Sequence, residues 1–259
     1  MWRLHHALRH LVGDPCGGRR PSSHRLLVPM PDQPWSYNPA AAALTGLAEM
    51  GPARLHKVLA GHHPIEAVEW VCHGGVPDGI PQTLSAAWRA ALCRFDPGAA
   101  EARLKEGSLT ATWNAAPRHP TFLTDDLGPA PVLFWRSCPI DETAPAVAIA
   151  GTRRASGIGR EIARELGSGL AEAGVTVVSG PGLGIDGSAH AGAFPSATAP
   201  PVAFVGGGGD VVYPKRHHEL WGRMVEFGTV AAEAPPGERP SPWRFLARNP
   251  LSLRRLTSW

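Results

Sequence analysis

Apolar residues recur three and four positions apart through residues 35–108, the spacing of one face of an α-helix. This pattern predicts a small all-α domain. The expected helices span residues 40–50, 53–59, 65–72 and 84–95. Residues 1–34 mix Arg, His, Gly and Pro without sustained periodicity, so we expect them to be disordered, or to be an extension that translation from Met30 omits.

The pattern changes at residue 144, where short apolar runs followed by glycine-rich turns alternate with helical stretches. The expected strands are 146–150, 175–179, 202–205 and 229–232, and the expected helices are 158–173 and 215–227. Such alternation predicts an α/β domain over residues 144–259, a Rossmann-like doubly wound parallel sheet. We expect residues 109–143 to be a connector, with the apolar run 131–135 as an edge strand.

Composition narrows the class of protein. Hydrophobic residues make up 43% of the chain and charged residues 18%, which is typical of a soluble globular protein. The formal charge of +3 does not by itself mark a nucleic-acid binder. The cysteines Cys16, Cys72, Cys93 and Cys138 lie far apart, and no apolar run approaches the roughly 18–20 residues of a membrane helix. We therefore expect a cytoplasmic protein without a membrane segment, a metal site or a cofactor.

The first candidate loop, Gly151-Thr152-Arg153, follows an expected strand and precedes an expected helix. Glycines there let a ligand approach the backbone, and arginines add positive charge, so a phosphate-rich ligand is indicated. The spacing of the glycines in this loop differs from the GxGxxG pattern of dinucleotide-binding proteins, which counts against a dinucleotide cofactor. A plain turn with solvated arginines is the alternative.

The second loop contains Ser179, Gly180, Gly182 and Gly184. Asp186 is placed to cap the helix that follows, and His190 lies four residues later on the same helical face. An Asp and a His invite an acid–base interpretation, but no nucleophile or further metal ligand has suitable spacing. A structural role is the stronger interpretation.

The third loop runs through residues 206–214 and ends in Tyr213 and Pro214. Lys215 follows at the start of an expected helix. Because loops after parallel strands gather at one edge of a sheet, this basic group could meet the same anion as Arg153. The alternative is a solvated helix start, although positive charge there opposes the helix dipole.

The helical region carries one further candidate. Residues 47–55 resemble the hairpin of a helix-hairpin-helix unit, in which backbone amides can hold a DNA phosphate. A plain packing unit of two helices is the alternative.

Taken in order, these motifs resemble the DNA-processing protein A (DprA/Smf) family over about residues 35–249. The resemblance rests on the run from Val147 to Arg153, the Ser179–His190 loop and helix, Tyr213-Pro214, and Arg248-Asn249. It implies a SAM-like or helix-hairpin-helix domain before the sheet. It also implies a non-catalytic protein that binds single-stranded DNA, protects incoming DNA in natural transformation and helps to load the RecA recombinase.

Site residues follow from the same resemblance. It places Arg153 on the DNA backbone, with Lys215 and Arg248 lining the same pocket, and it assigns Gly151, Gly182 and Gly184 to the pocket floor. The DNA-binding set expected here also contains Thr152 and Asn249. Homodimerisation is a further expectation.

Two positions depart from the family pattern. Pro181-Gly182 replaces Leu-Ala, and Arg248-Asn249-Pro250 replaces Arg-Asn-Arg. We hypothesise a frameshift or premature stop near Asn249, which would remove the surfaces for self-association and for RecA. Two alternatives stay open: a nucleotide hydrolase of the lysine-decarboxylase-like type, whose Thr and Glu are missing from the glycine loops, and a non-functional fragment.

Overall fold

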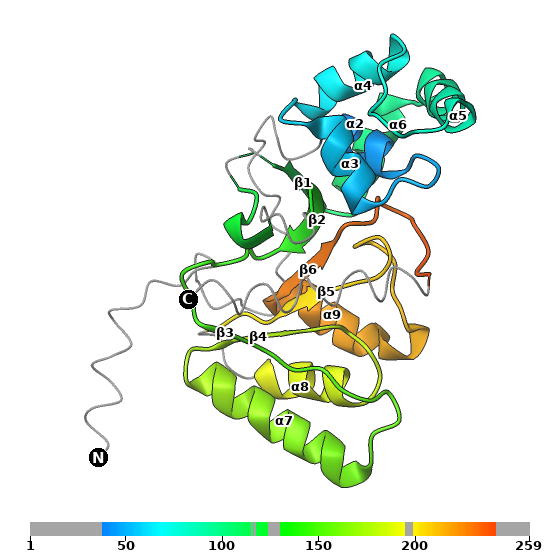
Figure 1. The fold of residues 1–259 in the computed structure, drawn as a ribbon. Coiled ribbons are helices and arrows are strands. Elements are labelled where there is room, and N and C mark those ends of the chain that lie inside the picture. The colour runs from blue at the N-terminus through cyan, green and yellow to red at the C-terminus, as the bar shows by residue number, and fades with distance from the viewer. Residues whose placement is uncertain (1–37, 115, 117, 124–129, 195–198, 242–259) are drawn as a thin grey trace.

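The computed structural model describes residues 38–114, 116, 118–123, 130–194 and 199–241. A bundle of short helices comes first, and a six-stranded sheet with three helices packed on it follows (Figure 1). The expected α/β class, with a mostly parallel sheet preceded by helices, is confirmed. Predictions for residues 1–34 and for Arg248 and Asn249 lie outside the described residues.

Prolines mark where most of the first helices begin. The five helices are α2 (Pro39–Thr45), α3 (Pro52–Leu59), α4 (Pro64–Cys72), α5 (Gln82–Cys93) and α6 (Pro97–Glu106). Four of them start with proline, whose fixed φ suits the first helical residue and whose missing N–H costs nothing there. The separate helix α6 was not resolved by the sequence pattern.

The turn between α2 and α3 is bonded into the helical core. Trp88 of α5 is buried, and its indole N–H donates to the Ala48 carbonyl at 2.8 Å. The Arg54 side chain donates to the Glu49 carbonyl at 2.6 Å. The predicted two-helix unit around residues 47–55 therefore exists, whereas its DNA contact stays a prediction.

The sheet has the order β1-β2-β6-β5-β4-β3. Its strands are β1 (Thr110–Trp113), β2 (Val132–Ser137), β3 (Ala146–Ala148), β4 (Thr176–Ser179), β5 (Val202–Phe204) and β6 (Thr229–Ala232). The last four strands are mutually parallel, and β1 and β2 add to them antiparallel. The expected strands after residue 144 are thus all present, within one or two residues at their ends.

The crossover helices are α7 (Gly157–Glu172), α8 (Ile185–Ala193) and α9 (His218–Phe227), and all three lie on one side of the sheet (Figure 1). This follows from the strand order, because β3, β4, β5 and β6 are added in one direction by crossovers of one hand. A doubly wound sheet adds strands in both directions from its first strand and so carries helices on both faces. The described residues add strands in one direction only, so this part of the sheet is singly wound.

The predicted edge strand at residues 131–135 is wrong in its position. This segment forms β2, which pairs with β1 on one side and β6 on the other, and its first four residues are buried. The edge is β1, which the sequence pattern did not reveal because all four of its residues are buried and two are threonines. The expected connector thus contributes two strands to the sheet, and the predicted domain boundaries stay predictions.

Strands β1 and β2 lie between two apolar clusters, one in the helical bundle and one on the opposite face of the sheet. Ala111 and Phe134 face the helical bundle in one apolar cluster. Leu133 and Trp135, at alternating positions of β2, belong to a second cluster with Val178 and other strand residues on the far face of the sheet. No described helix has the length and apolar content that crossing a bilayer requires.

Helices α7 and α8 approach each other so closely that only glycine fits at two positions. A β-carbon at Gly167 of α7 would collide with the Ala189 carbonyl of α8, and one at Gly192 of α8 would collide with the Arg164 carbonyl of α7. We expect Gly167→Ala to lower the free energy of unfolding by about 1–3 kcal/mol through overpacking. Urea unfolding measures this.

Gly169→Ala is the matched control in the same helix, because a β-carbon there meets nothing within 4 Å. It should raise stability by up to about 1 kcal/mol through helix propensity. Equal effects of the two substitutions would contradict the packing argument.

His119 makes stability depend on pH. Its ring is buried, Nδ1 lies 3.2 Å from the Thr112 hydroxyl, and burial lowers its pKa from 6.5 to about 4. The unfolded chain therefore binds a proton at a higher pH than the folded chain does, so stability present above pH 6.5 is lost as the pH falls toward 4. The loss amounts to about 3 kcal/mol. Urea unfolding at pH 7 and at pH 4 measures the stability that the chain loses on acidification. In His119→Gln this loss should be smaller than in the parent chain by about 3 kcal/mol. An equal loss in the two proteins would contradict the role of His119.

Candidate functional site

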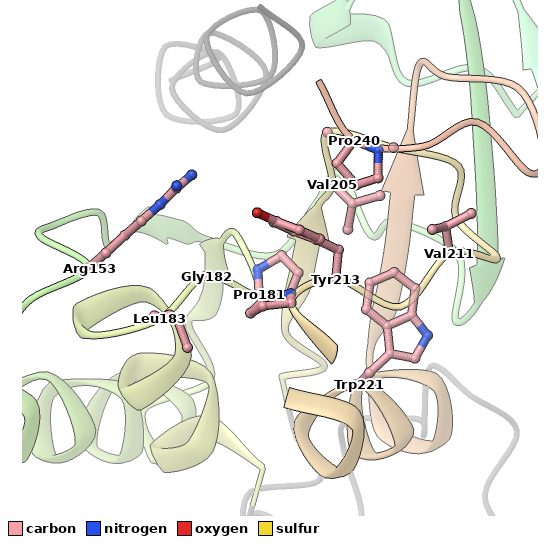
Figure 2. A pocket seen from close by; sticks show the side chains of 12 residues that line it. Arg153, Pro181, Gly182, Leu183, Val205, Val211, Tyr213, Trp221 and Pro240 are labelled. Atoms are coloured by element: carbon pink, nitrogen blue, oxygen red, sulfur yellow. The ribbon is translucent and has the colours of Figure 1, made fainter. Parts of the chain in front are cut away.

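The loops after the parallel strands meet at the carboxyl edge of the sheet and enclose a small pocket (Figure 2). They supply most of its lining, and α9 supplies Trp221. The lining residues are Arg153, Pro181, Gly182, Leu183, Val205, Gly206, Gly207, Val211, Tyr213, Pro214, Trp221 and Pro240. Ligands of open α/β sheets bind at this edge.

The loop that carries Arg153 is locked to the start of α8. The Gly151 amide donates to Asp186 Oδ1 at 3.1 Å, and the Ile185 amide donates to the Thr152 carbonyl at 3.3 Å. A β-carbon at Gly151 would lie 2.6 Å from Ile185 Cγ1. The loops after β3 and β4 therefore form one interlocked unit that presents Arg153.

Gly184 makes this interlock sterically possible. Its φ is +79°, and a β-carbon would collide with the Thr152 carbonyl oxygen. Gly184 also stands at the N-cap of α8. An L-residue at this position would be strained in its backbone and would push the Arg153 loop away.

The prediction that Asp186 caps α8 is wrong. Gly184 is the capping residue, no side-chain cap is present, and Asp186 is the second residue of the helix. Its carboxylate reaches across to the Gly151 amide, 35 residues earlier in the chain. This contact is tertiary and replaces the local cap that the sequence predicted. Gly151 accordingly shapes the loop, since its N–H is already donated.

Ser179 and His190 are not among the residues that line the pocket. The Ser179 hydroxyl donates to the Ile149 carbonyl at 2.5 Å and so joins the ends of β4 and β3. His190 is completely buried in α8. Neither residue lines the pocket, and neither does Gly180. The structure therefore separates the Asp and His that suggested acid–base chemistry from the candidate ligand surface.

One wall of the pocket is apolar and the opposite side carries a charge. Tyr213, 44% exposed, stands over Pro181, with Trp221 deeper in the wall (Figure 2). The Arg153 side chain extends from the other side (Figure 2), and Arg153 is the one charged residue among the described lining residues. Together they offer a cation for a phosphate and an aromatic ring for a planar group.

The basic residues after Pro214 do not enter the lining. Lys215 is exposed in a 3-10 turn, η3 (Lys215–His217), so the expected helix begins as a 3-10 turn and continues as α9. His217 Nδ1 lies 3.2 Å from the Pro181 carbonyl and ties this turn to the loop after β4. The structure thus brings Arg153, Gly182, Tyr213 and Pro214 together and leaves Lys215 beside the pocket.

The sequence analysis missed Asp210 and Arg103, which anchor the third loop. Asp210 Oδ1 accepts from the Gly237 amide at 2.8 Å, and Oδ2 lies 3.3 Å from Arg103 Nε of α6. Burial lowers the pKa of the Arg136 guanidinium, and Asp210 opposes that shift. The available signal was an acidic residue directly after four glycines, but the sequence did not indicate its partner, which lies 107 residues away.

No group of three or more His, Cys, Asp or Glu side chains that could hold a metal ion occurs in the part of the chain that the structure describes.

Comparison with known proteins gives consistent matches. The model of the DNA recombination-mediator protein A family matches residues 101–253. A DNA processing protein DprA of Mycobacterium tuberculosis is 45% identical over 127 residues, which are 48% of this chain and 32% of that protein. DNA processing protein DprA of Bacillus subtilis is 26% identical over 149 residues, 57% of this chain and 50% of that protein. The chain thus spans a third to a half of these relatives' length.

Two solved structures resemble the fold. DNA processing protein A from Streptococcus pneumoniae superposes with a TM-score of 0.66 at 22% identity, over 83% of this chain and 73% of that one. DNA processing protein A from Helicobacter pylori, whose structure addresses its single-stranded DNA binding mode, gives a TM-score of 0.51 at 26% identity, over 57% and 65%.

The two contacts of Asp210 should contribute unequally to the free energy of unfolding. Asp210→Ala leaves the Gly237 amide without its acceptor and should lower the free energy of unfolding by about 1–3 kcal/mol. Arg103→Ala removes an ion pair in which the arginine is 56% exposed and should cost less than about 1 kcal/mol. The double variant should match Asp210→Ala in urea unfolding. A larger loss for Arg103→Ala than for Asp210→Ala would show that the amide contact is not the main anchor.

Proposed function

The chain belongs to the DNA recombination-mediator protein A family, and from this we propose that it is a non-catalytic protein that binds single-stranded DNA. The observation that carries the proposal is the position of Arg153, which faces an apolar, aromatic wall across the carboxyl-edge pocket. The Helicobacter pylori relative, described as a single-stranded DNA binder, supports the same class of ligand.

The charge chemistry suits a nucleic-acid backbone. Arginine pairs well with phosphate oxygens, and Arg153 is exposed at the mouth of the pocket. The interlock with Asp186 and Gly184 holds its loop in place, so less ordering is needed when a strand binds. Contacts to phosphate alone are independent of base sequence.

The apolar wall suits an unpaired base. Tyr213 is an exposed residue of this wall, and aromatic rings stack on bases of any identity in proteins that bind single strands. A base in a duplex is already stacked and paired, so this wall favours a single strand. Tyr213 thereby takes a direct binding role, beyond the structural one expected from sequence.

The wider role follows from the family. We place the protein in the cytoplasm, where it would protect incoming DNA in natural transformation and assist the loading of RecA. Thr152, Gly182 and Gly184 shape the pocket in this proposal, while Lys215, Arg248 and Asn249 add contacts along the bound strand.

The charge and the ring should affect binding differently. We expect Arg153→Ala to weaken binding of a fluorescent oligo(dT) about tenfold and to reduce the salt dependence of binding by about one phosphate contact, roughly 0.7 in log–log slope. Tyr213→Ala should lower affinity by about 1–3 kcal/mol without changing that slope. Fluorescence anisotropy across a salt series measures both quantities.

Arg164→Ala is the matched control, because it removes the same charge from the exposed surface of α7, away from the pocket lining. It should bind as the parent chain does. If Arg153→Ala and Arg164→Ala lost equal affinity for oligo(dT), binding would depend on the overall positive charge of the protein and not on this pocket. Release of free base from nucleoside monophosphates would contradict the non-catalytic assignment.

A further inference from the structure

A cluster of arginines surrounds one serine between β3 and α7. Residues 151–160 contain Arg153, Arg154 and Arg160 and no acidic residue. Ser156 lies among these arginines, with two of them standing two and three positions before it, and it is exposed. In the part of the chain that the structure describes, no other serine or threonine has arginines at both of these positions.

Both ends of this segment pack on one side chain of α8. A β-carbon at Gly151 would lie 2.6 Å from Ile185 Cγ1, and one at Gly159 would lie 3.6 Å from Ile185 Cδ1. The chain therefore turns back on itself between these two glycines. This turn keeps Ser156 close to the backbone of Arg153, whose side chain lines the pocket.

The Ser156 hydroxyl is accessible to a modifying enzyme. The residue has an extended backbone, with φ −63° and ψ 166°, and its Oγ accepts a hydrogen bond from the Gly159 amide at 3.1 Å. Residues 151–154 and residue 157 are exposed on the two sides of it, and Ala155 alone is buried. An enzyme could thus reach both the hydroxyl and the arginines that precede it.

A phosphate on Ser156 is compatible with the start of α7. An oxygen of the phosphoserine can still accept from the Gly159 amide, and the helix dipole favours negative charge at this end. The Arg160 guanidinium, which donates to the Ala155 carbonyl at 2.6 Å, supplies an opposite charge to the same turn. Modification would therefore leave the helix folded and change the charge of the loop.

We propose that Ser156 is a phosphorylation site for a serine kinase that recognises the two preceding arginines, and that its phosphate weakens DNA binding at the adjacent pocket. The effect on DNA rests on the function proposed above. In the reaction, Ser156 Oγ bonds to the γ-phosphorus of ATP and the bond from that phosphorus to the β–γ bridging oxygen breaks. ADP leaves, and the hydroxyl proton passes to a base of the kinase. Carboxylates in the substrate groove of such a kinase pair with arginine side chains.

The phosphate acts on the charge that attracts DNA. A phosphoserine carries a charge of about −1.5 to −2 at pH 7. At Ser156 it stands three residues from Arg153, so it competes with the DNA phosphate for the guanidinium and repels the strand. The loop is basic when Ser156 is unmodified and loses most of its positive charge when Ser156 is phosphorylated.

Two substitutions separate the charge at Ser156 from the shape of the side chain. Asparagine and aspartate have nearly the same size and are both good N-cap residues. Ser156→Asp should bind oligo(dT) about threefold more weakly than Ser156→Asn at low salt, and added salt should shrink the difference by screening the charges. Fluorescence anisotropy measures both affinities. The same pair at Ser168, further along α7, is the matched control and should show no such difference.

Mass spectrometry tests the modification itself. Treatment of the full chain with an arginine-directed serine kinase and ATP should add a phosphoryl group that peptide mapping locates on Ser156. Ser22 and Thr257 follow arginines at the same spacing outside the described residues, so their peptides report that the kinase is active. The treated parent chain should bind oligo(dT) about tenfold more weakly than Ser156→Asn treated in the same way, which differs only at this position.

An unmodified Ser156 in a chain whose Ser22 peptide is phosphorylated would overturn the assignment of the site. Equal affinities of Ser156→Asp and Ser156→Asn, with circular dichroism showing that both are folded, would overturn the effect on binding. The mass measurement involves no DNA, so it is judged separately from the proposed function, which fails if the parent chain does not bind oligo(dT).

Discussion

The hydrogen bond from the Gly151 amide to the Asp186 carboxylate determines how the carboxyl edge of the sheet is built. It joins the loop after β3 to the first turn of α8, and it works only because Gly184 allows the Thr152 carbonyl to approach. A buried or half-buried carboxylate that accepts a backbone amide is a directional contact that fixes a loop. Arg153 therefore projects from a rigid base rather than from a free turn.

A second carboxylate organises the other side of the same pocket. Asp210 joins the glycine loop after β5 to the turn at Gly237 and to Arg103 of the helical bundle. Since both pocket walls are fixed by contacts distant in sequence, the helical bundle contributes to the site without lining it. The bundle thus supports the carboxyl edge through the Arg103–Asp210 contact.

The sequence predicted the parallel part of the fold well, for a physical reason. Buried parallel strands require continuous apolar runs, and the runs at residues 202–205 and 229–232 match β5 and β6. Strand β1 escaped because its threonines carry no apolar signal, and β2 was misplaced at the edge because order within a sheet is not written in a local pattern. Asp186 was assigned a local cap because its partner lies in a different loop.

The sequence by itself determined the element types, the glycine loops and the presence of Arg153 after a parallel strand, because periodicity and turn chemistry are local properties. Only the tertiary structure decided that Tyr213 and Trp221 share a pocket with Arg153, and that Lys215 stands outside it. These results depend on which loops and strands become neighbours, and neighbours are chosen by packing over the whole chain.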